Sequence, residues 1–156
     1  MIQYHLSQKD YNDRMNTKSA FRRFLCKLFG FLIQIVFSNR MRIQLARSMG
    51  IKVGKNIYIG KYCIIDDTFS DLIDIGDNVV ISFGTTITTH DASCNKIAPV
   101  VIKTGAFIGT RSVILPGVTL AENSVVGAGS VVTHSVPPGT IVAGCPAKVI
   151  KSKTAN

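Results

Sequence analysis

The chain has 156 residues, of which 46% are hydrophobic and 17% charged; this excludes a globally disordered chain and fits one packed domain with an extension. The formal net charge of +9 lies in the first third: residues 1–55 hold eleven Lys or Arg and two Asp or Glu, whereas residues 56–156 hold seven of each. Such a basic segment either is a solvated face or attracts phosphates and anionic lipid. No nucleic-acid-binding motif accompanies it, so we expect no nucleic-acid partner.

The N-terminal 50 residues predict a polar and helical segment. Residues 1–18 are polar and aperiodic. An apolar helix is expected over 20–37, and a shorter one over 39–49, ended by Gly50. The apolar run is too short to cross a bilayer, which needs about twenty apolar residues.

Two roles for residues 20–50 follow from this composition. A helix that is apolar on most sides must cover something, and we expect it mainly to cap the first coil of the domain that follows. The alternative is peripheral contact with a membrane surface, helped by Arg22, Arg23 and Lys27.

After Gly50 the chain repeats every six residues. Aliphatic side chains recur at this interval at Val53, Ile59, Ile65, then Ile75, Ile81, Ile87, then Ile102, Ile108, Ile114, then Leu120, Val126 and Val132. Small or aliphatic residues sit four positions after most of them, at Ile57, Cys63, Val79, Thr85, Ala106, Ser112, Val118, Ser124 and Ser130. The period fits neither a helix nor an amphipathic strand. It predicts short strands that turn after each repeat, three to a coil, with stacked coils paired as parallel strands about 4.8 Å apart.

The two breaks in the period respect this three-strand coil. Four extra residues separate Ile65 from Ile75, and nine separate Ile87 from Ile102. Both insertions follow a third strand, so both are expected to leave the prism at the same corner.

The C-terminal tail reads VPPGTIVAGCPAKVIKSK, and its prolines end the regular coils. We expect it to fold back and cap the open end of the prism, whose strand edges would otherwise be exposed. The predicted organisation is thus a segment over 1–50, a β-helix over 51–137 with a loop at 90–100, and a capping tail over 138–156.

Four cysteines, Cys26, Cys63, Cys94 and Cys145, show no CxxC spacing, and no secretory leader is apparent. We therefore expect a reduced, cytoplasmic protein with neither a disulfide framework nor a bound metal.

Three stretches resemble the hexapeptide-repeat acyltransferases, above all the maltose, galactoside and polysaccharide O-acetyltransferases. They read DLIDIGDNVVISFGTTITTHDAS at 71–93, VVIKTGAFIGTRSVILPGVTL at 100–120 and GAGSVVTHSVPPGTIVAGCPAKVIK at 127–151. The resemblance implies an all-β, left-handed parallel β-helix that assembles as a homotrimer. It also implies acetyl-CoA as co-substrate, a groove between subunits as the active site, and a sugar or polysaccharide precursor as acceptor.

His90 is the candidate general base. It lies three residues past Ile87, at the corner where the nine-residue insertion leaves the prism, and the family's catalytic histidine falls at this position. A neutral imidazole can remove a hydroxyl proton near neutral pH. Asp66 and Asp67 are expected at the same corner one coil earlier, where Asp66 would orient the imidazole, bind acceptor hydroxyls or only hold a turn; Asp91 is a weaker candidate for this role.

The resemblance also implies a set of donor-binding residues near the pantetheine, nucleotide and phosphates of CoA. They are Thr110, Ala128, Thr133, His134, Lys148 and Lys151. Three positions depart from the family: His134 stands where Lys is usual, Lys148 where Arg is frequent, and Cys145 where a non-thiol residue is usual.

Four alternatives stay open at this point. One is an N-acetyltransferase acting on an amino sugar nucleotide, and another is a non-enzymatic β-helix scaffold. A third is a covalent route through Cys94. The fourth, a zinc carbonic anhydrase of the same fold, needs clustered histidines, whereas only His5, His90 and His134 exist.

Overall fold

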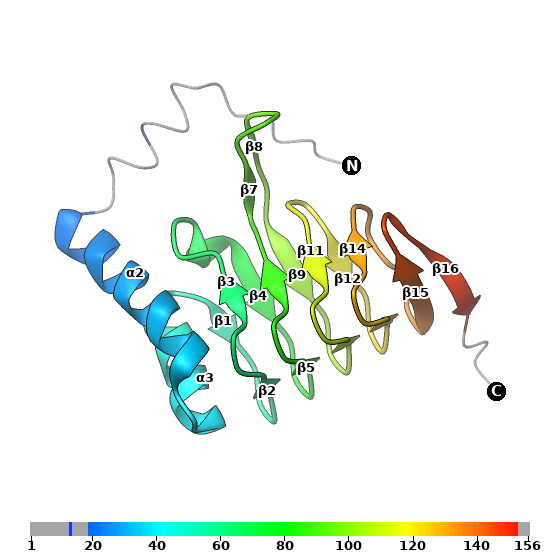
Figure 1. The fold of residues 1–156 in the computed structure, drawn as a ribbon, viewed down its shortest axis with the longest axis horizontal. Coiled ribbons are helices and arrows are strands. Elements are labelled where there is room, and N and C mark those ends of the chain that lie inside the picture. Colours follow the sequence, from blue (N-terminus) through cyan, green and yellow to red (C-terminus); the bar gives the residue numbers. More distant parts are fainter. Residues whose placement is uncertain (1–12, 14–18, 153–156) are drawn as a thin grey trace.

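The computed structural model describes residue 13 and residues 19–152. The polar, aperiodic segment expected over residues 1–18 therefore lies outside the described residues, except for Asp13. The fold is a left-handed parallel β-helix with N-terminal helices, as predicted. Its coils are stacked along one axis (Figure 1).

Three parallel sheets form the sides of the prism. The first contains β1 (Lys52–Val53), β4 (Ile73–Ile75), β9 (Val100–Ile102) and β12 (Thr119–Leu120). The second contains β2 (Tyr58–Ile59), β5 (Val80–Ile81), β10 (Phe107–Ile108), β13 (Val125–Val126), β15 (Thr140–Gly144) and the antiparallel β16 (Ala147–Ser152). The third contains β3 (Ile64–Ile65), β6 (Thr86–Ile87), β11 (Val113–Ile114) and β14 (Val131–Val132).

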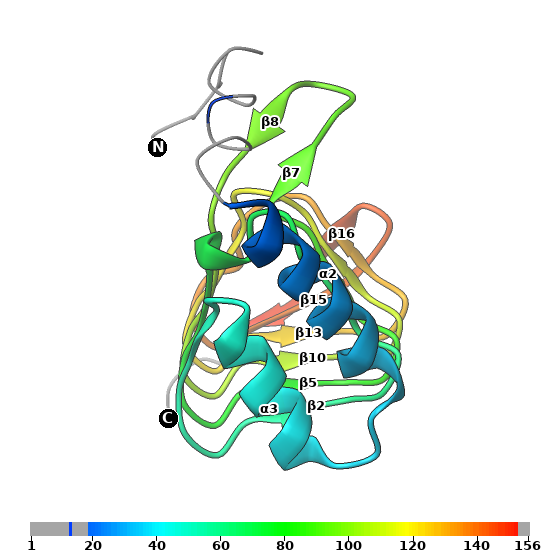
Figure 2. The ribbon, with the colours of Figure 1, turned by 90° about the vertical axis from the view of Figure 1, so that its left-hand side faces the viewer.

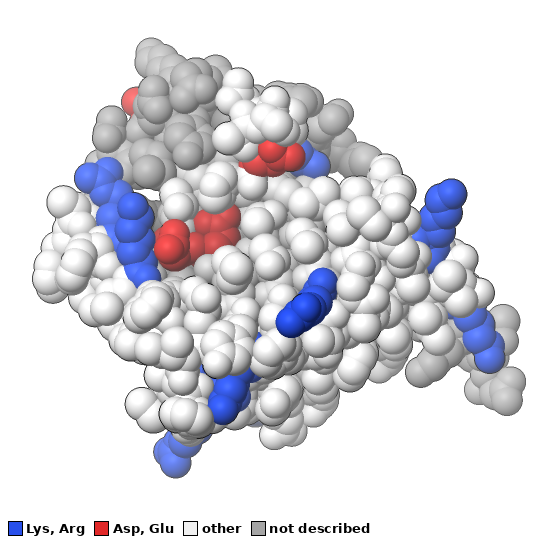
Figure 3. Space-filling view, in the orientation of Figure 1, with Lys and Arg blue, Asp and Glu red and all other residues white. Residues whose placement is uncertain are grey.

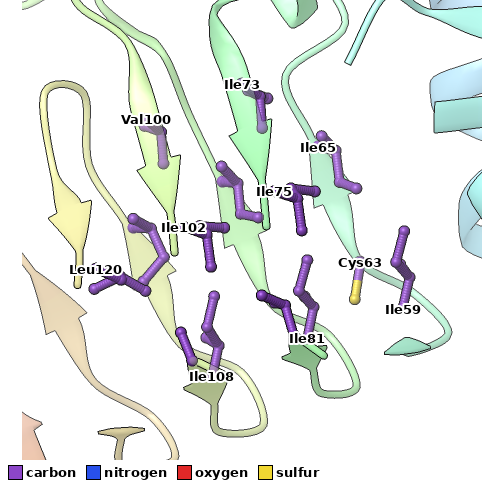
Figure 4. Packing of buried hydrophobic residues seen from close by; sticks show 14 of the residues in the cluster. Ile59, Cys63, Ile65, Ile73, Ile75, Ile81, Val100, Ile102, Ile108 and Leu120 are labelled. Carbon is purple, nitrogen blue, oxygen red and sulfur yellow. The ribbon is translucent and has the colours of Figure 1, made fainter. Parts of the chain in front are cut away.

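The six-residue period produces ladders of like side chains inside the prism. In the second sheet Ile59 pairs with Ile81, Ile81 with Ile108, and Ile108 with Val126. These side chains are fully buried, and Figure 4 shows Ile59, Ile81 and Ile108 stacked in register. Each coil therefore covers the apolar interior of its neighbour, which is what stabilises strands only two residues long.

The corners of the prism require small residues. We call the corner between the second and third sheets the second corner, and the corner from the third sheet to the first sheet of the next coil the third corner. At the second corner a Cβ on Gly60 would lie 2.5 Å from the backbone nitrogen of Phe83, and one on Gly109 would lie 2.5 Å from that of Ala128. Only glycine lets adjacent coils stack this closely.

Both insertions leave at the third corner, as predicted. The first contains the 3₁₀ turn η1 (Ser70–Leu72), and the second contains β7 (His90–Asp91) and β8 (Lys96–Ile97). β7 and β8 pair antiparallel as a hairpin that projects from the prism (Figure 1).

Helices α2 (Ala20–Ile35) and α3 (Asn39–Ser48) cover the first coil at one end of the prism (Figure 2). Cys26 and Ile33 of α2 and Ala46 of α3 are buried in the same core as the coils. The buried Arg42 of α3 donates from Nε to the Ile59 carbonyl at 2.6 Å. The two helices thus cover the first coil, and each helix ends slightly earlier than predicted.

At the other end, β16 returns antiparallel along β15 and forms the edge of the second sheet. The tail folds back as expected, and residues 153–156 lie outside the described part. None of the described helices is long and apolar enough to span a membrane.

Candidate active site

His90 and Asp66 meet at the third corner. His90 Nδ1 lies 2.6 Å from Asp66 Oδ2, although 24 residues separate them in the chain. The contact arises because Ile65 pairs with Ile87, so the residues that follow these two strands leave the prism side by side in adjacent coils.

The Asp66 carboxylate is buried and surrounded by donors. Its Oδ1 accepts the amides of Thr68 and Phe69 at 2.9 and 3.1 Å. Its Oδ2 accepts the Thr89 amide at 2.9 Å and the Thr89 hydroxyl at 2.7 Å, besides facing His90. Burial by itself would raise the pKa of Asp66, but the hydrogen bonds from Thr89, Phe69 and His90 together hold that pKa below its ordinary value. Asp66 is therefore a carboxylate at neutral pH.

This carboxylate determines which nitrogen of His90 is available for chemistry. An ionised Asp66 accepts a hydrogen bond from an Nδ1 that carries a proton. In a neutral imidazole the lone pair then lies on Nε2, which this contact does not involve. The Phe69 ring meets the imidazole edge-on, with 5.6 Å between ring centroids. The His90 side chain is 33% exposed, whereas that of Asp66 is 1% exposed. The arrangement can orient an accessible base and stabilise the imidazolium formed when it takes a proton.

The hairpin beyond His90 is held by its own polar contacts. Asp91 Oδ1 accepts the amide and the hydroxyl of Ser93 at 2.9 and 2.6 Å, and these bonds lower the pKa of Asp91. Asp91 thus closes the turn of the hairpin through Ser93. Cys94 is exposed in the same turn.

A cleft of about 480 Å³ lies between α2 and the insertion that carries Asp66. Arg23, Phe24 and Lys27 line it from the helix, and Asp67 and Thr68 line it from the third corner. Figure 3 shows basic side chains beside the start of α2, next to an acidic group on the same face. Because Thr68 donates its amide to Asp66, the cleft begins directly beside the His90–Asp66 pair.

The donor candidates Thr110 and Ala128 lie at the second corner, away from His90. Both are exposed, and the Thr110 carbonyl accepts the Gly129 amide at 2.8 Å, so the two residues occupy adjacent coils. The third sheet separates this corner from the corner of His90. One chain therefore does not bring Thr110 and Ala128 together with the imidazole.

The remaining donor candidates lie toward the C-terminal end. Thr133 and His134 follow β14 at the third corner, on the same ridge as His90 and two coils further along. The Thr133 hydroxyl contacts His134 Nδ1 at 2.8 Å. Lys148 and Lys151 are exposed on β16.

Two residues that position the His90–Asp66 pair were not predicted from the sequence. Thr89 supplies two of the five hydrogen bonds to Asp66, and Phe69 supplies one amide and the ring against His90. The signal for Thr89 was its place directly before His90 at the corner, where a residue facing the previous coil meets Asp66.

No group of three or more His, Cys, Asp or Glu in the described residues could hold a metal ion.

Family models match the two halves of the β-helix. The model for the bacterial transferase hexapeptide (six repeats) matches residues 99–134, and the model for the hexapeptide repeat of succinyl-transferase matches residues 50–89. The chain belongs to the hexapeptide-repeat acyltransferase family. The insertion that carries His90 begins between the two matched segments, directly after the residues that the second model covers.

Known members resemble this hexapeptide-repeat chain in sequence and structure. The galactoside O-acetyltransferase of Escherichia coli is 37% identical over an alignment of 110 positions, which covers 65% of this chain and 53% of that enzyme. A hexapeptide-repeat acetyltransferase from Vibrio cholerae superposes with a TM-score of 0.72 at 27% identity, covering 92% of this chain and 99% of that one. It has also been crystallised with acetyl-CoA. A maltose O-acetyltransferase from Clostridium difficile gives a TM-score of 0.68 at 25% identity, covering 97% and 100%. The matched part of this chain spans only 53–62% of the first curated relatives.

Proposed function

We propose that the protein transfers an acetyl group from acetyl-CoA to a hydroxyl of a sugar or polysaccharide precursor, with His90 as general base. The observation that carries the proposal is the His90–Asp66 pair, in which a buried carboxylate 2.6 Å from Nδ1 orients a partly exposed imidazole. Family membership and the acetyl-CoA complex of the Vibrio cholerae relative support acetyl-CoA as donor.

In this reaction Nε2 of His90 takes the acceptor hydroxyl proton as the acceptor oxygen attacks the thioester carbonyl. Asp66 stabilises the imidazolium through Nδ1. The carbon–sulfur bond then breaks, and the departing CoA thiolate receives the proton from Nε2, which yields an O-acetyl ester and free CoA. No acyl-enzyme is formed, so Cys94 takes no part in the transfer.

The cleft between α2 and the third corner is the proposed acceptor site. It adjoins the His90–Asp66 pair, and Asp67 and Thr68 offer oxygens that can bind sugar hydroxyls. The galactoside and maltose enzymes among the relatives support a saccharide acceptor. An amino sugar nucleotide is the competing acceptor, and a panel of both classes separates O-transfer from N-transfer.

The donor residues predict that the site is shared between copies of the chain. Thr110 and Ala128 lie at the second corner and His90 at the third, and the third sheet spans the distance between the two corners. In a threefold ring whose third sheets face the axis, the third corner of one copy meets the second corner of the next.

The outward side chains of the third sheet suit this arrangement. They form a mainly apolar ladder of Ile64, Thr86, Val113 and Val131. The first sheet, by contrast, presents the exposed charges of Lys52 and Asp74. We therefore propose a homotrimer with its active sites at the subunit boundaries.

The direct test is His90→Ala, which should lower kcat by about 10² to 10⁴. Release of free thiol from acetyl-CoA in the presence of each acceptor measures it. His134→Ala is the matched control: it removes an exposed histidine on the same ridge and should raise KM for acetyl-CoA with little change in kcat. Retention of most turnover by His90→Ala would overturn the assignment.

A further inference from the structure

The outer face of helix α2 carries a stripe of large apolar side chains that the fold does not use. Its members are Phe21, Phe24, Leu28, Phe31 and Ile35, and their exposed fractions run from 39% to 71%. They recur at alternating steps of three and four residues, so they form one continuous line along the helix. We call this line the α2 stripe.

The α2 stripe lies opposite the face that caps the coil. Cys26, Gly30 and Ile33 point into the core and are buried. The helix is therefore apolar on two sides, and capping accounts for only one of them. Just beyond the helix, Phe37 and Met41 extend the exposed apolar surface, with exposed fractions of 84% and 53%.

Basic side chains flank this surface. Lys27 is exposed in the second turn of α2, next to Leu28 of the stripe, and the Lys61 ammonium lies 4.1 Å from the centroid of the Phe37 ring at the other end. The helix itself contains no Asp or Glu. An apolar line edged by cations is the pattern of helices that lie in the headgroup region of a bilayer.

The same charges disfavour a second copy of α2 as the occupant. Two such helices packed stripe to stripe would bury Lys27 of each beside the apolar contact, and neither helix contains an Asp or Glu that could face it. An anionic lipid surface offers phosphates to this lysine.

The position of the stripe also suits a flat surface. α2 lies across one end of the prism, in front of the coils when the molecule is viewed from that end (Figure 2). In the proposed trimer, three parallel prisms would present three stripes at the same end, which multiplies a weak single contact. Phe24 belongs to the stripe and also lines the cleft beside Asp67, so the acceptor cleft opens at the edge of this surface.

We propose that the α2 stripe docks the protein on an anionic membrane surface, lying in the interface without spanning the bilayer. Phe21, Phe24, Leu28, Phe31 and Ile35 enter the headgroup boundary, and the flanking cations bind lipid phosphates.

The test is co-sedimentation of the full chain with vesicles of phosphatidylcholine, alone or mixed with phosphatidylglycerol. The wild-type protein should bind the mixed vesicles at low salt, and the binding should weaken as salt rises. In the triple variant Phe21→Gln, Phe31→Gln, Ile35→Gln, vesicle binding should weaken by at least about tenfold, because the substitutions remove apolar area from the interface. Its melting temperature should stay near that of the wild type, because all three side chains are exposed.

A matched control removes exposed apolar side chains at the opposite end of the prism. Val149→Gln with Ile150→Gln on β16, where the exposed fractions are 60% and 67%, should leave vesicle binding unchanged. The proposal is overturned if the wild type stays in the supernatant with anionic vesicles at low salt, or if the stripe variant binds as the wild type does. It is equally overturned if the stripe variant sediments as a smaller oligomer, since a second copy would then be the occupant. Vesicle binding is measured without turnover, so its failure leaves the proposed acetyl transfer standing.

Discussion

The coil and the N-terminal helices use apolar side chains in opposite ways. In the coil, the aliphatic residue of each repeat points inward and is buried, as Ile81 and Ile108 are. In α2, Ile33 is fully buried, but Phe31, two positions away, is 59% exposed. A repeat with a fixed period therefore indicates directly which residues are buried. An apolar helix at the end of a prism indicates two apolar faces, but it does not indicate which of the two is buried.

The largest expected effect on stability comes from the ladder of buried aliphatic side chains inside the prism. Ile108→Ala removes a fully buried side chain that pairs with Ile81 and Val126, and should lower the free energy of unfolding by about 2–5 kcal/mol. Phe107→Ala, its outward-facing neighbour, should cost less than about 1 kcal/mol. Urea unfolding of both variants measures the contrast, and equal losses would show that the ladder is not the source of stability.

The junction between helices and coil should be almost as sensitive. Arg42 donates to the carbonyls of Ile59, Val36 and Phe37 from a buried position. Arg42→Met keeps the aliphatic stem but leaves these carbonyls unpaired, and should lower the free energy of unfolding by about 2–4 kcal/mol. Arg40→Met, at an exposed position of the same helix, is the control and should change it by less than about 0.5 kcal/mol. A similar loss in both would mean that the arginine does not join cap to coil.

A smaller and pH-dependent effect is expected at the third corner. Asp66→Asn places an amide where Oδ2 faces the donors of Thr89 and His90, and should cost about 1–3 kcal/mol at neutral pH. Because folding lowers the pKa of Asp66, its carboxylate stabilises the fold above the ordinary value of 3.8 and loses this contribution as pH falls through the lowered pKa.

Chemical unfolding between neutral and strongly acidic pH measures this dependence. The acid-side decline should be shallower in Asp66→Asn than in the wild type. Asp74→Asn, an exposed position on β4, should keep the wild-type slope. An unchanged slope in Asp66→Asn would contradict the hydrogen-bonded role of the carboxylate.

The smallest effect is expected on the outer face of α2. Phe31→Gln should change the free energy of unfolding by less than about 0.5 kcal/mol, because the fold does not bury this side chain. Ile33→Gln, on the buried face of the same helix, should destabilise strongly. Comparable losses in the two variants would mean that the stripe is covered within the protein.

The sequence predicted the coil well because its signal is redundant. Each aliphatic position independently predicts a buried side chain, and the two insertions interrupt the period only where the third strand of a coil ends. The placement of His90 beside Asp66 followed from the same counting. The helix ends were placed less well, because α2 stops at Ile35 whereas the apolar run continues to Phe37.

Other features depended on which coil faces which side chain. Thr89 reaches Asp66 only through a contact between coils, so no local motif marks it. Phe69 lies three residues after Asp66 and donates to it locally, but its ring meets His90 only across coils. The two apolar faces of α2 could not be assigned either, because the position of the first coil decides which one is buried. The separation of Thr110 and Ala128 from His90 likewise required the corners to be assembled.

The central claim is that His90 of one copy acts with Thr110 and Ala128 of the next. His90→Ala removes the base, and Ala128→Trp should block the donor at the second corner; each variant alone should be inactive. When the two are unfolded together and refolded in equal amounts, every mixed trimer contains one boundary with both residues intact. About a quarter of the wild-type specific activity should return, because three-quarters of the trimers are mixed and each has one working site of three. Failure of the mixture to regain activity, with mixed trimers present, would contradict a site shared between copies.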